Sequence, residues 1–246
     1  AGVHILGIKD MAGVMKPAAA RLLVGALKEE IGLPIHFHTH DTTGTAAATV
    51  LAAIEVGADA VDLAMDSMSG LTSQPCLGAI VESLRGTERD AGLSTKAIRE
   101  ISSIWEGVRT QYKAFEAANR SGTSEVYLHE MPGGQFTNLK EQARSLNIEH
   151  RWSEIATAYA EANELFGDIV KVTPTSKVVG DMALMMVMQG LNRDDVLSSD
   201  REIAFPDSVK DMLRGGLGRP TGGWPERLVK RVLGDERPIA VRPGAL

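Results

Sequence analysis

A repeated alternation of short apolar stretches and helix-forming stretches constrains the first part of this chain more than any other feature. Each apolar stretch has the length of a strand and is followed by a longer stretch of good helix formers. The predicted strands cover residues 3–9, 35–40 and 59–65, and the predicted helices cover residues 17–32, 45–56 and 75–86. Strands that alternate with helices over short connections are typical of a parallel α/β fold, which is the fold class we predict.

Polar side chains stand where each predicted strand ends. These positions are Lys9-Asp10, His38 to Asp41, and Asp66-Ser67. In parallel α/β folds, chemistry gathers at the carboxyl ends of the strands, so we expect these groups to share one edge. Three strand–helix units cannot close a barrel, and the chain enters its first strand without an initiator methionine. We therefore expect preceding strands outside this sequence.

The second predicted strand carries three histidines in alternation. His36, His38 and His40 point to one face, and Phe37 and Thr39 point to the other. Residues on one face lie about 6.6–6.8 Å apart along a strand. Two imidazoles therefore have the spacing to reach one ion beyond the strand's end, each at a metal–nitrogen distance of about 2.0–2.1 Å. The alternative is a row of hydrogen-bonded core histidines, because an unsatisfied buried polar group costs about 1–3 kcal/mol.

Composition excludes several classes of protein. The 246 residues are 43% hydrophobic, enough for a sizeable core, and the net charge of -6 argues against nucleic acid as the main partner. A single cysteine, Cys76, excludes an internal disulfide framework and fits a reducing compartment. No apolar run approaches the roughly 20 residues that span a bilayer. The methionine-rich residues 182–188 are expected to form a core helix.

Helical periodicity dominates after residue 94. Ser94 is placed to cap a long helix that we expect to reach about residue 119. Its apolar residues at three- and four-residue spacing are expected to be core contacts: Ile98, Ile101, Trp105, Val108 and Tyr112. Glycine and proline become frequent after Phe205. We therefore predict a partial barrel in residues 1–90, a helical extension in residues 91–205 and a C-terminal appendage in residues 206–246.

Six segments together point to a known family. Residues 8–13 read IKDMAG, residues 36–42 read HFHTHDT, and residues 64–70 read AMDSMSG. Residues 131–135 read MPGGQ, residues 171–177 read KVTPTSK, and residues 242–245 read RPGA. In these motifs and their order, the chain closely resembles the carboxyltransferase domain of the pyruvate carboxylases, biotin-dependent enzymes that make oxaloacetate.

The resemblance implies a TIM-type (β/α)8 barrel whose mouth is capped by a helical extension. This chain would be the last three strand–helix units together with that extension. The family's metal site implies three ligands here: Lys9, carboxylated on its side-chain nitrogen, His38 and His40. The ion would be divalent zinc, manganese or cobalt. The family's metal-binding aspartate and pyruvate-binding arginine have no counterpart in this sequence, since both lie upstream.

The resemblance also assigns roles in the helical part. Thr173 would bind substrate and relay a proton between the pyruvate methyl group and biotin, while Ser176, Lys177 and Gln135 would line the biotin pocket. Biotin would arrive on a separate carrier domain, because this chain holds no biotinylated lysine context. The resemblance further implies a homo-oligomeric parent enzyme, in the cytoplasm or in the mitochondrial matrix of a eukaryote, without nucleic-acid or membrane partners.

Simpler interpretations of these residues stay open. Lys9 would pair with Asp10 or Asp41 at a strand end, Thr173 would be a helix cap, and Ser176 and Lys177 would be the first turn of a helix. His36, one step deeper in its strand, is expected to be structural or to orient another ligand. Other functions also remain: an oxaloacetate decarboxylase or transcarboxylase type of carboxyltransferase, a metal-dependent acyl-condensing enzyme, or an inactive scaffolding fragment.

Overall fold

The computed structural model describes residues 2–116, 121–198, 201–239, 241 and 244. The chain divides into two compact units, residues 1–134 and residues 135–246. In sequence order, unit 1 contains β1 (Leu6–Asp10), α1 (Pro17–Glu30), β2 (Ile35–Thr39), α2 (Ala46–Glu55), β3 (Ala60–Val61), η1 (Asp66–Met68), α3 (Leu77–Leu84), α4 (Thr95–Gln111), η2 (Lys113–Phe115) and α5 (Val126–His129). The functional division at residues 90 and 205 stays a prediction.

The three strands form one parallel sheet in the order β1-β2-β3. This confirms the predicted α/β class with its strand–helix alternation. Strand β1 starts at Leu6, later than predicted, because pairing begins where the Leu6 amide donates to the Pro34 carbonyl, next to the first residue of β2. Strand β3 is shorter than predicted, because it pairs with β2 only at Ala60 and Val61.

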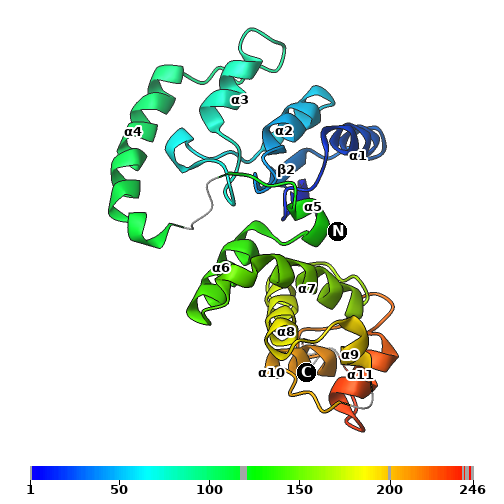
Figure 1. Ribbon diagram of the computed structural model, residues 1–246. Helices are drawn as coiled ribbons and strands as arrows, with labels where there is room; N and C mark the ends of the chain where they lie inside the picture. Colours follow the sequence, from blue (N-terminus) through cyan, green and yellow to red (C-terminus); the bar gives the residue numbers. More distant parts are fainter. Residues whose placement is uncertain (1, 117–120, 199–200, 240, 242–243, 245–246) are drawn as a thin grey trace. The chain divides into compact units, whose positions relative to one another are not determined.

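Helices α1 and α2 pack against each other beside the strands (Figure 1). Helix α1 begins at Pro17, where a proline's missing amide costs nothing. The alternation of β2 turns Ile35 and Phe37 into a core that is sealed by the two helices. The buried members of this core are Ala20, Val24, Ile35, Phe37, Val50, Ala52, Ala53, Ile54, Ala58 and Ile80. The apolar face of β2 is thus buried, which leaves its histidine face for the site.

Helix α4 starts as predicted but packs differently. The Ser94 side chain accepts a hydrogen bond from the Ala97 amide at 3.3 Å, which confirms the cap. The helix ends at Gln111, and part of the predicted continuation lies outside the described residues. Of the five predicted core contacts only Ile98 is buried, whereas Ile101, Trp105 and Tyr112 are exposed. The prediction fails because α4 packs on η1 and α3 along one narrow stripe.

Unit 2 is helical. It continues α6 (Gly133–Ser145), which begins in unit 1, with η3 (Glu149–Arg151), α7 (Trp152–Leu165), α8 (Thr175–Gln189), α9 (Arg193–Leu197), α10 (Asp207–Arg214) and α11 (Glu226–Leu233). Helices α7 and α8 make its most extensive contact, and α10 packs on α8. Met182, Met185 and Met186 are buried, which confirms the methionine-rich core helix. Helix α8 ends at Gly190 in the left-handed conformation.

Candidate active site

Two neighbouring strands bring the predicted metal ligands of unit 1 together. Lys9 on β1 lies directly opposite His38 on β2 in the strand register. His36, His38 and His40 are half-buried, whereas Phe37 and Thr39 between them are buried. The predicted alternation of β2 is therefore confirmed. The histidine face is less buried within this chain than the sequence suggested.

The rings of His38 and His40 are oriented by hydrogen bonds on their Nδ1 atoms. His38 Nδ1 lies 2.7 Å from Oδ2 of Asp62, and His40 Nδ1 lies 2.7 Å from the carbonyl oxygen of Thr72. A carbonyl oxygen only accepts, so His40 Nδ1 must carry the proton. Burial lowers the pKa of His40 below its usual value, although the bond to Thr72 opposes this effect. Neutral His40 therefore presents an unprotonated Nε2.

The Nε2 atoms of His38 and His40 converge to 3.2 Å. Two lone pairs repel at this distance unless a positive charge, a proton or a metal ion, lies between them. Two nitrogen ligands of one tetrahedral zinc ion lie about 3.3–3.4 Å apart, so the observed separation fits a shared metal ion. The described residues contain no group of three histidine, cysteine or acidic side chains placed to hold one metal ion. A third protein ligand from this part of the chain would have to be of another type, as Lys9 is.

The simpler interpretation of Lys9 is not confirmed. Lys9 is exposed, and no ion pair among the described residues joins its ammonium to Asp10 or Asp41. Asp10 instead accepts hydrogen bonds from the amides of Val14 and Met15 and from the Thr39 hydroxyl. Asp41 accepts from the Ala46 amide at the start of α2, and burial raises its pKa. Both carboxylates thus hold the loops beyond the strands, and Lys9 remains accessible.

The predicted relay residue lies in unit 2, before helix α8. Thr173 is exposed, and its peptide bond to Pro174 is cis. Helix α8 begins at Thr175, and its N-cap position is Pro174, without a side-chain cap. Thr175, not Thr173, braces this segment, because its hydroxyl lies 2.9 Å from the Val170 carbonyl and accepts from the Val172 amide. The interpretation of Thr173 as a helix cap is therefore wrong.

The three residues predicted to line a biotin pocket also belong to unit 2, but they differ in exposure. Ser176 and Gln135 are buried, and the Gln135 amide packs against Gly180, one turn after Ser176 on α8. Lys177 is exposed and forms an ion pair with Asp181 at 2.7 Å. Ser176 and Gln135 thus share the inner face of α8, and Lys177 stands on its outer face.

Sequence reasoning missed Asp62 and Thr72, which orient the two imidazoles. Both lie far from the histidines in sequence, and neither an aspartate nor a threonine at these positions indicates by itself that it orients an imidazole. The one available signal was position, since Asp62 belongs to the third predicted strand and Thr72 follows its end. An accepting group for each imidazole was required in any case, because metal-binding histidines donate their second ring N–H.

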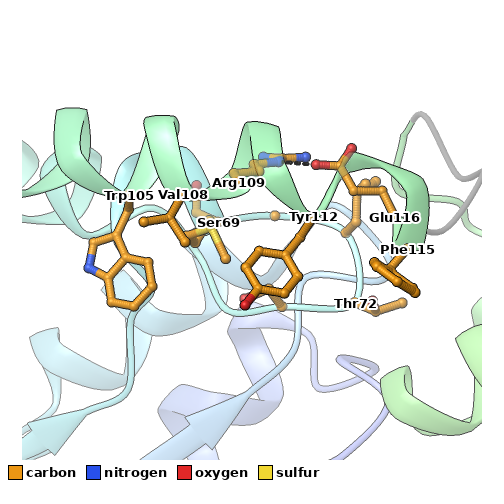
Figure 2. A pocket seen from close by; sticks show the side chains of 12 residues that line it. Ser69, Thr72, Trp105, Val108, Arg109, Tyr112, Phe115 and Glu116 are labelled. Atoms are coloured by element: carbon orange, nitrogen blue, oxygen red, sulfur yellow. Dashed lines mark hydrogen bonds and ion pairs between the residues drawn. The ribbon is translucent and has the colours of Figure 1, made fainter.

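A pocket of about 550 Å³ lies between the loop 68–73 and helix α4. Figure 2 shows Trp105, Val108 and Tyr112 projecting from α4 along one wall. Arg109 closes one side, where its Nε donates to Glu116 at 2.6 Å and its Nη1 to the Ser67 carbonyl at 2.5 Å. Thr72, whose carbonyl orients His40, belongs to the opposite wall. The exposed apolar face of α4 is therefore continuous with a loop of the site.

Comparisons with known proteins agree along the chain. Residues 1–104 match the HMGL-like family, and residues 126–246 match the conserved carboxylase domain. Pyruvate carboxylase of Bacillus subtilis is 48% identical over 246 residues, which are 100% of this chain and 21% of that protein. Pyruvate carboxylase of Schizosaccharomyces pombe is 54% identical over 245 residues, which are 99% of this chain and 21% of that protein. The chain thus spans about a fifth of the length of these relatives.

A solved structure matches the whole fold. The carboxyl transferase domain of Rhizobium etli pyruvate carboxylase, determined with 3-hydroxypyruvate, is 66% identical with a TM-score of 0.98. The match covers 100% of this chain and 41% of that chain. The parallel α/β unit, the paired imidazoles and these matches define part of a carboxyltransferase domain. Along its whole length the chain matches pyruvate carboxylases, which confirms the resemblance seen in its motifs.

Among the described helices, none is long and apolar enough to cross a membrane.

Proposed function

We propose that this chain contributes to transfer of the carboxyl group of carboxybiotin to pyruvate, which gives oxaloacetate. The observation that carries the proposal is the convergence of His38 Nε2 and His40 Nε2 to 3.2 Å, with Lys9 opposite on the next strand. Further support comes from the Rhizobium etli domain, 66% identical, which was solved with pyruvate and biocytin.

Lys9, His38 and His40 would hold a divalent metal ion, zinc, manganese or cobalt. Carboxylation of the Lys9 amine would turn a cation into an anionic oxygen ligand, which suits such an ion beside two neutral imidazoles. When bound, the ion supplies stabilisation of the negative charge that develops on the pyruvate enolate. The chain's own residues set its position: Asp62 and Thr72 direct both Nε2 atoms toward one point.

Thr173 would move the proton. Its hydroxyl both donates and accepts, and its pKa lies far above neutral, so giving and taking must occur together. Carboxybiotin releases CO2 by cleavage of its N–C bond, and the electron pair stays on biotin. Biotin then takes the pyruvate methyl proton through Thr173, and the enolate carbon forms the new bond to CO2. The Thr173 side chain is exposed and makes no hydrogen bond within the described residues, so its hydroxyl is accessible for this exchange.

Biotin would be held near the start of α8 by Ser176, Lys177 and Gln135, and a separate carrier domain would deliver it. Since Ser176 and Gln135 are buried, Lys177 is the member of this set that lies open to a ligand. Its ammonium is suited to stabilise the enolate-like form of biotin. We also propose a homo-oligomeric parent enzyme. Relatives occur in bacteria and in mitochondria of rat, in line with a cytoplasmic or matrix enzyme.

The test is decarboxylation of oxaloacetate by the complete domain, with and without free biotin. Thr173→Ala should lower the biotin-dependent rate by about 10²–10⁴-fold, the usual contribution of a proton-transfer group. Thr173→Ser keeps a hydroxyl and should retain most of the rate. Thr175→Ala is the matched control, since its hydroxyl serves the backbone only. Turnover indifferent to biotin and to Thr173 would leave only metal-assisted decarboxylation and contradict the proposal.

A further inference from the structure

Asp62 connects two of the three histidines of β2. Its backbone amide donates to the Phe37 carbonyl at 3.1 Å, which fixes Asp62 beside the middle of β2. His36 and His38 flank Phe37 and point to the face opposite to it. Oδ1 of Asp62 lies 2.8 Å from His36 Nε2, and Oδ2 lies 2.7 Å from His38 Nδ1. Each carboxylate oxygen therefore forms a hydrogen bond with one imidazole.

The direction of both hydrogen bonds follows from their geometry. Each carboxylate oxygen of Asp62 has its own imidazole nitrogen, and both bonds form at once when the carboxylate is ionised and both rings donate. An ionised carboxylate only accepts hydrogen bonds. His38 Nδ1 must therefore donate, and neutral His38 keeps its lone pair on Nε2, the atom that lies 3.2 Å from His40 Nε2.

We propose that Asp62 is the positioning residue of the imidazole pair. It fixes His38 in the tautomer with an unprotonated Nε2 and directs that nitrogen toward His40. His36 acts through Asp62, because its hydrogen bond keeps a half-exposed carboxylate from turning away from His38. This inference rests on the proposed metal site for its purpose, but the tautomer of His38 does not depend on that proposal.

The decisive substitution is Asp62→Asn, which preserves shape and removes the charge. An asparagine offers one acceptor atom and one donor group to two imidazoles that need two acceptors. Its amide group would donate to one of them, His38 Nδ1 or His36 Nε2, and move the proton of that ring to its other nitrogen. The first readout is the ¹⁵N chemical shifts of the His36 and His38 rings in the metal-free chain. We expect protonated His38 Nδ1 and His36 Nε2 in the native chain, and loss of the proton from one of these two atoms in Asp62→Asn.

The second readout is zinc affinity, measured by competition with a chromophoric chelator. Loss of a carboxylate partner of a metal-binding histidine lowers affinity by about 10–100-fold, and we expect that loss in Asp62→Asn. Asp59→Asn is the matched control. Asp59 also belongs to the third predicted strand and accepts from the Ile35 amide and from Lys28, and among the described residues it forms no hydrogen bond with a histidine. Its substitution should affect thermal stability without changing the His38 tautomer or zinc affinity.

A second pair of variants tests the role of His36. His36→Gln keeps a donor for Oδ1 of Asp62 and should keep native zinc affinity, whereas His36→Leu should lower it severalfold. This pair also covers the case in which Asp62→Asn does not fold, since His36 lies on the half-buried face. Equal zinc affinity of both His36 variants would show that the bridge does not hold His38.

The inference is overturned if both His36 and His38 keep their native tautomers in Asp62→Asn, or if Asp62→Asn behaves like Asp59→Asn in both readouts. If the native chain binds no zinc but Asp62→Asn still shows the expected change of tautomer, the metal proposal is contradicted and the role of Asp62 is supported. The two failures are therefore distinguishable.

Discussion

Gly133 lies where a side chain would displace His40. A Cβ atom at this position would lie 3.0 Å from His40 Nδ1 and 3.0 Å from the Thr72 carbonyl oxygen. These two atoms form the hydrogen bond that orients the ring. The adjacent Gly134 has open space around the same position. At the start of α6, a Cβ atom at Gly133 would therefore disturb the hydrogen bond of His40, whereas a Cβ atom at Gly134 would contact nothing.

Substitution of each glycine by alanine tests this difference. Gly133→Ala should lower the free energy of unfolding by about 1–3 kcal/mol through overpacking, and it should weaken zinc binding by tilting His40. Gly134→Ala should raise the free energy of unfolding by up to about 1 kcal/mol, because alanine is the better helix former. Urea denaturation and zinc titration measure both effects. Identical behaviour of the two variants would refute the role of Gly133.

At the residue scale, the sequence predicts the candidate metal-binding histidines better than it predicts the residues that orient them. The period of two along β2 was enough to place His36, His38 and His40 on one face. Asp62 and Thr72 were out of reach, because they lie 24 and 32 residues from the histidines they bind. Only the paired strands and the loop after β3 bring them close.

Glu82 joins two helices of unit 1. The last turn of α3 carries Glu82, which accepts hydrogen bonds from Arg85 and from the Thr95 hydroxyl at the start of α4. These bonds lower the pKa of Glu82 to about 2. The carboxylate is the stabilising form, so its contribution is present above pH 4.5 and is lost as the pH falls toward 2.

Glu82→Gln should therefore remove part of the acid sensitivity of folding. The native chain should have the higher melting temperature at pH 7, and the difference should shrink as the pH falls from 4.5 to 2. Thermal unfolding followed by circular dichroism over this range gives the measurement. A difference that stays constant with pH would contradict the assignment.

The start of α8 gives a second prediction at the scale of an element. Thr175→Ala should lower the free energy of unfolding by about 1 kcal/mol, because its hydroxyl braces the backbone of residues 170–172. Thr173→Ala should leave stability unchanged, since that hydroxyl has no partner among the described residues. Chemical denaturation of both variants checks this. A larger loss in Thr173→Ala would restore the interpretation of Thr173 as a cap.

Element types were predictable where the periodicity was strong, as in α1, β2, α2 and α8. Two errors share one physical cause. Strand β3 was predicted too long and α4 too buried. The apolar residues of a segment indicate that it can be buried, but they do not indicate which other segments pack against it. Within the described residues β3 has a strand neighbour on one side only, and α4 keeps Trp105 and Tyr112 exposed.

At the scale of the whole molecule, the exposed face of α4 and η2 is the largest departure from expectation. Phe115 is 83% exposed, and Trp105 and Tyr112 line the same pocket (Figure 2). An apolar patch of this kind promotes association. The match covers 41% of the solved Rhizobium etli chain. Most of that chain therefore has no counterpart among these residues.

Phe115→Ser should reduce self-association of the chain while the free energy of unfolding changes by less than about 0.5 kcal/mol, as is usual for exposed positions. A buried residue in the first turn of α4 supplies the contrast. Ile98 is 6% exposed, and Ile98→Ser should lower the free energy of unfolding by about 2–5 kcal/mol. Sedimentation velocity and denaturation measure the two properties. Unchanged association in Phe115→Ser would show that this patch does not drive it.

The central claim is that His38 and His40 hold one divalent metal ion in the carboxyltransferase domain to which this chain belongs. Metal content per domain, determined by mass spectrometry after dialysis against zinc, tests it most directly. His38→Gln and His40→Gln should each abolish bound metal, and His36→Gln should retain it, because His36 only supports Asp62. Metal that persists without His38 or His40, or that is lost equally in His36→Gln, would contradict the account.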